Sequence, residues 1–200
     1  MPVTIEAWRI TGQSQIDSYV GRWAGLAVLL VNELHVTQAR GRSLEPPADR
    51  RAALEAAFAH HDWTPVPRDE SDESPVRLTV EDADRLAGVA AELHAVFGGD
   101  VAALNRALVR HGAVPSLHGD PPVLAFHRPG ADRVDAWAAD ACTALAMVIG
   151  VGQGRRLRSC EAEGCDLVFF DVTRNASRRF CGLSCQNRAK ATAYRARRRT

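Results

Sequence analysis

The sequence lacks the motifs that mark several common enzyme classes. It contains no phosphate-binding P-loop, no G-x-G-x-x-G dinucleotide motif, no H-E-x-x-H protease motif and no G-x-S-x-G nucleophile elbow. It also contains no internal repeat. With no catalytic constellation to support an activity, we expect that the protein is not an enzyme.

Long apolar runs are missing as well. The longest, residues 23–31, is far shorter than the roughly 20 residues that a membrane helix needs. Residues 1–6 carry neither the basic nor the apolar region of a secretory signal. We therefore expect a cytoplasmic protein with no membrane partner, in a compartment that keeps thiols reduced.

The chain has little net charge, only +1, but its charges are unevenly distributed. Residues 155–200 hold 12 Lys and Arg against 4 Asp and Glu, a net charge of +8, whereas residues 1–154 carry −7. An acidic body is thus followed by a basic segment, which is the part expected to meet polyanions. The alternative is a solvated tail that only keeps the protein soluble.

Cysteines are few, but four of the five are paired in sequence. Cys160 and Cys165 are separated by four residues, Cys181 and Cys185 by three, and fifteen residues lie between the pairs. This spacing is typical of a tetrahedral four-cysteine zinc site. Two disulfides are the alternative interpretation, which a reducing compartment disfavours. The fifth, Cys142, lies in an apolar helical pattern and is predicted to be a core residue.

One structural Zn²⁺ ion is the predicted cofactor. Four protein thiolates close the coordination shell and leave no position for a reacting water, so the ion should stabilise a small module rather than catalyse. With four thiolates the site carries a charge of −2, which nearby cations can offset. The candidates are Arg158, Arg178, Arg179 and Arg188.

The cysteine-bearing segment predicts a treble-clef-like finger. A strand leads to Cys160, a turn at Gly164 adopts positive φ, and a second strand covers residues 167–170. A helix then begins at Cys181, so that both cysteines of the second pair lie on its first turn and face the same side. It continues to Arg199.

The first 150 residues predict a mostly helical domain. Helices are expected at residues 17–38, 46–60, 79–97, 100–112 and 131–151, a loop at 62–78, and short strands within 1–12, 113–118 and 122–128. The predicted fold class is therefore mainly α with a minor β component. The predicted domains are 1–152, mostly helical, and 155–200, the finger with its basic helix, joined by a hinge at 152–154.

Two polar pairs interrupt the apolar helical patterns. Asn32 and Glu33 are interpreted as an exposed pair on a polar helix face; if buried, they need hydrogen-bond partners. His60 and His61 are adjacent, so their side chains point about 100° apart and make a poor chelate.

The last helix predicts a nucleic-acid surface. Ala189, Ala193 and Ala196 form a small-residue stripe expected to pack on the finger, and cations cover most of the remaining surface, which suits phosphate contacts. The candidate nucleic-acid-binding residues are Arg174, Arg178, Arg179, Asn187, Arg188, Lys190, Tyr194, Arg195, Arg197, Arg198 and Arg199. The alternatives are a merely solvated helix, or a structural zinc module that binds protein or RNA.

The finger residues resemble the CGNR zinc finger. The resemblance rests on Arg158-x-Cys160-x4-Cys165-x3-Phe169-x-Asp171-x2-Arg174-Asn175-x2-Arg178-Arg179-Phe180-Cys181-x3-Cys185-Gln186-Asn187-Arg188-x-Lys190. Two positions depart from the family pattern. Gln186 replaces the glycine of the name motif and Phe180 replaces the usual tryptophan, and neither change removes a zinc ligand.

This resemblance implies a domain order and a role. In that family the finger usually follows a mostly helical ABATE domain, in bacterial proteins described as stress-induced transcriptional regulators. The N-terminal similarity here rests on residues 26–34, on Leu104 and Asn105, and on the domain order. The resemblance thus implies that the finger binds double-stranded DNA, while the helical domain senses a small-molecule effector or mediates homodimerisation.

Overall fold

Helices dominate the described part of the chain. The computed structural model describes residues 5–64 and 77–198, and for residues 5–15 only the backbone. The helices are α1 (Ile5–Leu34), α2 (Arg50–His60), α3 (Val80–Phe97), α4 (Val101–Arg110), α5 (Arg133–Gly150) and α6 (Leu183–Arg197). Three antiparallel strand pairs accompany them: β1 (Gln38–Ala39) with β2 (Arg42–Ser43), β3 (Ser116–His118) with β4 (Val123–Ala125), and β5 (Leu157–Ser159) with β6 (Val168–Phe170). The predicted mainly α class with a minor β component is confirmed.

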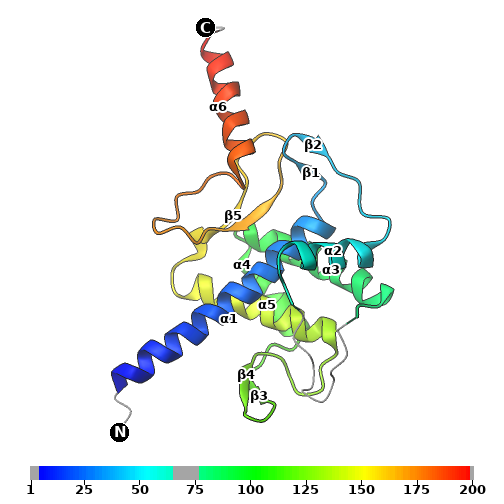
Figure 1. The fold of residues 1–200 in the computed structure, drawn as a ribbon, viewed down its shortest axis with the longest axis vertical. Coiled ribbons are helices and arrows are strands. Elements are labelled where there is room, and N and C mark those ends of the chain that lie inside the picture. The colour runs from blue at the N-terminus through cyan, green and yellow to red at the C-terminus, as the bar shows by residue number, and fades with distance from the viewer. Residues whose placement is uncertain (1–4, 65–76, 199–200) are drawn as a thin grey trace.

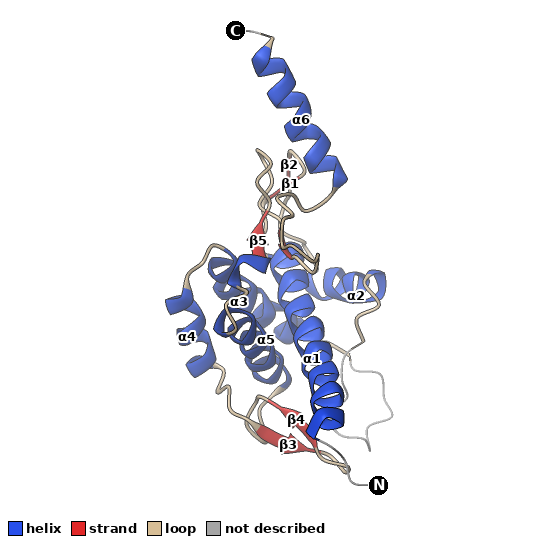
Figure 2. Ribbon diagram, turned by 90° about the vertical axis from the view of Figure 1, so that its left-hand side faces the viewer, coloured by secondary structure: helices blue, strands red, loops and turns tan. Residues whose placement is uncertain are grey.

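The core lies where α1, α3 and α5 pack together, with α2 and α4 on the flanks (Figures 1 and 2). Leu26 and Leu30 of α1, Leu86 of α3 and Leu145 of α5 are completely buried. Burying each such side chain contributes about 1.5–3 kcal/mol. We call residues 5–150 the helical part.

The buried apolar residues are distributed over several helices. Cys142 is fully buried among them, as predicted for a core thiol. Among the described residues, no helix combines the length and the apolar character needed to cross a lipid bilayer.

Local signals place most helix ends correctly. Thr79 and Asp82 form the reciprocal hydrogen bonds of a capping box at the start of α3. The second helix begins at Arg50, later than predicted from Pro46 and Pro47. Asp49 caps it by accepting a 2.9 Å hydrogen bond from the Ala52 amide.

The start of the chain and the segment after α1 differ from prediction. Residues 5–12 are helical rather than a strand, because they continue α1 without a break; residues 1–4 lie outside the described part, as does 65–76 of the predicted loop. Helix α1 ends at Leu34, before the predicted 38, and β1 and β2 follow. Their two-residue turn uses Arg40 (φ 54°) and Gly41 (φ 82°), a combination that two-residue hairpins favour.

The finger hairpin shares the core of the helical part. Leu157 of β5 and Val168 of β6 are buried in the same cluster as the helices, and β6 packs on α1. A 3₁₀ turn at Gly154–Arg156, which begins at the last residue of the predicted hinge, packs on α5. Helix α6, by contrast, projects away from the body, and the N-terminus of α1 lies at the opposite end (Figures 1 and 2).

Candidate metal centre and basic helix

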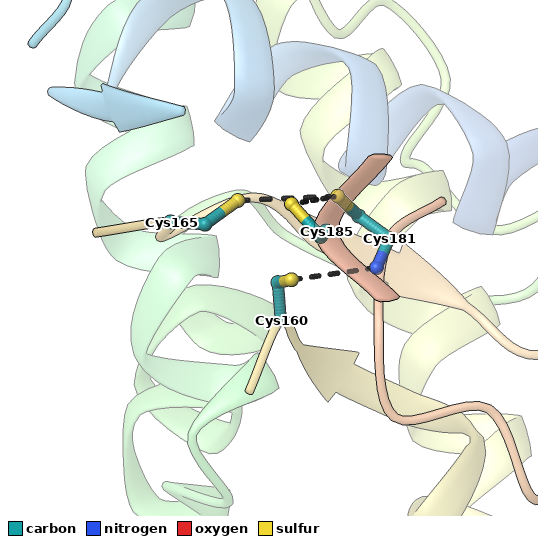
Figure 3. Close-up of side chains that lie close together, drawn as sticks. All are labelled: Cys160, Cys165, Cys181 and Cys185. Carbon is teal, nitrogen blue, oxygen red and sulfur yellow. Dashed lines mark hydrogen bonds between the residues drawn. The ribbon is translucent and has the colours of Figure 1, made fainter. Parts of the chain in front are cut away.

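The four paired cysteines converge on one point (Figure 3). Their Sγ atoms all lie within 4.8 Å of one another; Cys181 and Cys185 are 3.6 Å apart, and Cys165 and Cys181 are 3.9 Å apart. Ligands around a tetrahedral zinc with Zn–S bonds of about 2.3 Å are about 3.8 Å apart. A disulfide needs about 2.05 Å, and all five cysteines are free, so the disulfide interpretation is wrong. The residues fit one structural zinc ion.

A tight turn presents the first cysteine pair. We call residues 160–165 the knuckle. The Cys160 amide donates to the Leu167 carbonyl at 2.8 Å and so closes the knuckle against the strand that follows. Gly164 has φ 66°, the predicted positive value, which a residue with a side chain rarely adopts.

The second pair sits at the entrance of α6. Cys185 lies in the first helical turn and is completely buried, whereas Cys181 precedes the helix, whose N-cap is Gly182. The expectation that both cysteines lie on the helix is therefore wrong for Cys181. The Cys181 amide donates to Cys160 Sγ at 3.4 Å, and this hydrogen bond links the two cysteine pairs.

Burial and hydrogen bonding shift the pKa values of the clustered thiols in opposite directions. Burial raises the pKa of Cys181, as do the neighbouring thiols, and burial likewise raises that of Cys185. For Cys165 burial acts upward too, but backbone N–H donors from Arg40 and Leu167 outweigh it and the pKa is lowered. Such a cluster resists multiple deprotonation until a cation shares the charge, and so zinc binding releases protons.

Only one of the four candidate arginines, among the described contacts, reaches a ligand sulfur. Arg188 Nη1 lies 3.9 Å from Cys185 Sγ, and its Nη2 donates to the Glu163 carbonyl at 2.7 Å. Arg158 and Arg179 both pair with Glu161 instead, at 2.6 Å. Arg188 is therefore the cation placed to offset the thiolates.

Arg178 braces the approach to Cys181 instead of a sulfur. Its guanidinium donates to the Cys181 carbonyl at 2.7 Å and stands over the Phe169 ring at 5.0 Å from the centroid. It thus fixes the chain that enters the second cysteine pair.

A buried carboxylate organises the loop between β6 and the second pair. Asp171 is fully buried and accepts hydrogen bonds from the Thr173 amide (2.9 Å), the Thr173 hydroxyl (2.6 Å) and the Arg178 amide (2.8 Å). Burial alone would raise the pKa of Asp171, but these donors outweigh it and the pKa is lowered. The sequence places Asp171 in a turn and within the family resemblance, but it does not reveal that the carboxylate is buried and accepts these three hydrogen bonds.

Helix α6 is exposed along nearly its whole length beyond Cys185. Residues 190–198 are all exposed, and so are Leu183 and Asn187. The prediction that the alanine stripe packs on the finger is wrong for Ala193 and Ala196, since the helix leaves the body before reaching them, while Ala189 is half-buried.

The structure separates the predicted nucleic-acid residues into three sets. One set lies exposed on α6 and its C-cap: Asn187, Lys190, Tyr194, Arg195, Arg197 and Arg198. Arg178 and Arg188 are half-buried against the metal centre, whereas Arg174 and Arg179 are exposed before α6. Arg199 lies outside the described residues. A groove of about 550 Å³, lined by Ser177, Arg178, Arg179, Phe180, Gly182, Leu183 and Gln186, runs beside the start of α6.

Comparison with known proteins bears on this C-terminal region. No match to a curated protein was found. Residues 156–198, from the end of the 3₁₀ turn through α6, match the family model of the CGNR zinc finger, which agrees with the four-cysteine geometry. The chain thus carries a CGNR zinc finger domain at its C-terminal end.

Proposed function

We propose that the finger binds double-stranded DNA through α6 and that the protein regulates transcription. The observation that carries the proposal is the exposure of a projecting helix that bears Lys190, Arg195 and Arg198. An α-helix with its side chains is about 10–12 Å wide, close to the roughly 12 Å width of the DNA major groove. Cations on such a helix suit contacts with DNA phosphates.

One face of α6 has the chemistry to contact bases. At about 100° per residue, Leu183, Asn187, Lys190 and Tyr194 fall within one narrow sector, on the side of the helix opposite the buried Cys185. Asn pairs well with adenine, and Lys with guanine, in the major groove. Because the metal centre holds the other side of the helix, we propose that this face meets the groove floor while Arg195 and Arg198 contact phosphates.

We extend the proposal to the rest of the chain through the resemblance of residues 26–34 and of the domain order. The helical part would be an ABATE domain that senses a small-molecule effector or mediates homodimerisation, in a bacterial cytoplasmic stress regulator. In this scheme zinc stabilises the finger and takes no part in a reaction, and the protein has no enzymatic activity.

The proposal can be tested by anisotropy titration of a fluorescent duplex with the zinc-loaded protein over a salt series. If about four cations contact phosphates, log K should fall against log salt with a slope of about −3 to −4. The triple variant Lys190→Glu/Arg195→Glu/Arg198→Glu should lose binding.

A control with the same change of net charge comes from the helical part. Arg51→Glu/Arg106→Glu/Arg110→Glu alters three exposed arginines away from α6 and should keep binding close to wild type. Equal loss in both triple variants, or binding that ignores salt, would contradict the proposal.

A second candidate is docking on an acidic protein surface. It is favoured by two exposed apolar side chains on the same face of α6: Leu183 is 76% exposed and Tyr194 is 55% exposed. Charge reversal at Arg195 and Arg198 that abolishes a protein complex and leaves duplex binding unchanged would favour it. Binding to single-stranded RNA in preference to the duplex would instead identify an RNA partner.

A further inference from the structure

The β1–β2 turn (residues 38–43) is too small to be stable alone. Each strand has two residues, and isolated hairpins are at best marginally stable in water. Arg40 and Gly41 at its tip both adopt positive φ. Contacts outside the turn must therefore hold it, and those contacts lead to the metal centre.

Backbone hydrogen bonds join the turn to the knuckle on both sides of Cys165. The Gly41 amide donates to the Gly164 carbonyl at 2.8 Å, and the Asp166 amide donates to the Gln38 carbonyl at 2.9 Å. The two segments are more than 120 residues apart in sequence, and Figure 2 shows β1 and β2 beside the loops at the base of α6. The turn and the knuckle are thus joined by one backbone hydrogen bond on each side of Cys165.

The turn holds the residues on either side of a metal ligand and touches the neighbouring cation. Gly164 and Asp166, the two neighbours of Cys165, are both hydrogen-bonded to the turn, which orients this ligand. Gly41 lies against Arg188: a Cβ added to this glycine would stand 2.4 Å from Arg188 Nη2 and 2.6 Å from its Cζ. Because Arg188 also donates to Glu163 and approaches Cys185, it cannot move away without losing these contacts.

We propose that the zinc centre depends on two distant segments of the chain, with the β1–β2 turn as an outer layer that orients Cys165 and Arg188 and strengthens metal binding. This layer lies outside residues 156–198, which match the finger family. The helical part then contributes to zinc affinity. Because the coupling is reciprocal, bound zinc also stabilises the turn. The inference does not depend on whether α6 binds DNA.

Zinc affinity of the full chain tests the inference through Gly41→Ala. The added methyl displaces Arg188 and strains a positive φ, so affinity measured by chelator competition should fall about 10–100-fold. With Co²⁺ in place of zinc, the thiolate charge-transfer bands should shift. Gly130→Ala is the matched control, because Gly130 has φ +77° and an added Cβ there meets nothing within 4 Å. It should change neither affinity nor spectrum.

Arg188→Ala separates the two effects of the Gly41 substitution. If Gly41→Ala acts by displacing the guanidinium, its effect on zinc affinity should be several-fold smaller in the Arg188→Ala background, because contacting residues are not additive. Wild-type zinc affinity and an unchanged Co²⁺ spectrum in Gly41→Ala would overturn the inference.

A measurement on the unmodified chain covers the case in which Gly41→Ala does not fold. Hydrogen exchange of the Gly41 and Asp166 amides should slow at least about tenfold when zinc is added, because both are bonded across the turn and the knuckle. The Val114 amide, bonded to the Phe126 carbonyl beside the β3–β4 pair, serves as the control. Equal exchange of Gly41 with and without zinc would overturn the inference by itself.

Discussion

Asn32 of α1 holds Val168 of β6 through both halves of its side-chain amide. Its Nδ2 donates to the Val168 carbonyl at 3.0 Å, and the Val168 amide donates to its Oδ1 at 2.9 Å. The side chain thus takes the place of a neighbouring strand on the free edge of the finger hairpin. The interpretation of Asn32 as an exposed polar residue is wrong, whereas its neighbour Glu33 is exposed.

Replacing Asn32 should therefore loosen the finger from the helical part. Asn32→Leu leaves the amide and carbonyl of buried Val168 without partners, and we expect a loss of about 2–4 kcal/mol in the free energy of unfolding. Urea unfolding of the zinc-loaded protein measures it. Glu33→Ala, one residue away and exposed, should stay within about 0.5 kcal/mol of wild type. Similar losses in the two variants would contradict the pairing.

Removal of a zinc ligand should affect the finger more than the helical part. We expect wild type to bind one zinc per chain and Cys185→Ser to bind it far more weakly, with loss of helical signal from α6, since an isolated 15-residue helix is marginal in water. Zinc content and far-UV circular dichroism check both effects. Cys142→Ser is the thiol control and should retain one zinc. A loss of helical signal in Cys185→Ser much larger than α6 alone can account for would contradict an effect centred on the finger.

Asp171 should make the finger sensitive to acid. Its pKa is lower in the folded state than in the unfolded state, so the unfolded chain takes up protons first and stabilisation is lost as the pH falls below about 4. At pH 7 Asp171→Asn should lower the free energy of unfolding by about 1–3 kcal/mol. The amide has one oxygen where the carboxylate has two, so it cannot accept all three hydrogen bonds. The free energy of unfolding, measured from pH 7 to below pH 4, should differ less between wild type and variant as the pH falls. A difference that stays constant would contradict stabilisation by the ionised carboxylate.

Base recognition and phosphate contact should separate on α6, if duplex binding is established. In a selection from random duplexes, Asn187→Ala should relax the preference at one or two base pairs, by about 1–3 kcal/mol each, and leave non-specific affinity nearly unchanged. Arg198→Ala should instead weaken all sequences alike and reduce the salt slope by about one. If Asn187→Ala kept the wild-type sequence preference, Asn187 would not be a base-reading residue.

Features encoded by neighbouring residues were predictable from the sequence. The Thr79–Asp82 capping box and the four-cysteine cluster each depend on short spacings, and both are confirmed. The disulfide alternative could be removed only by the sulfur distances. Helix α6 was also predictable, because its continuity depends on local propensity.

Contacts between distant segments were not predictable. Nothing near Asn32 in sequence indicates that its partner is Val168, 136 residues away, and nothing near Gly41 indicates Arg188. The alanine stripe of α6 failed for a related reason: its pattern is compatible with packing, but Ala193 and Ala196 lie where the helix has left the body. Long-range geometry, rather than local pattern, decides these cases.

Zinc-dependent binding to duplex DNA tests the proposed function most directly. A fluorescent duplex would be titrated with the zinc-loaded protein, with protein stripped of metal by a chelator, and with stripped protein refilled with zinc. We predict salt-sensitive binding that falls at least about tenfold on metal removal, because the base of α6 is anchored through Cys185, and that returns with zinc. DNA binding through the finger would be contradicted if the zinc-loaded protein did not bind the duplex, or if it bound equally well with and without zinc.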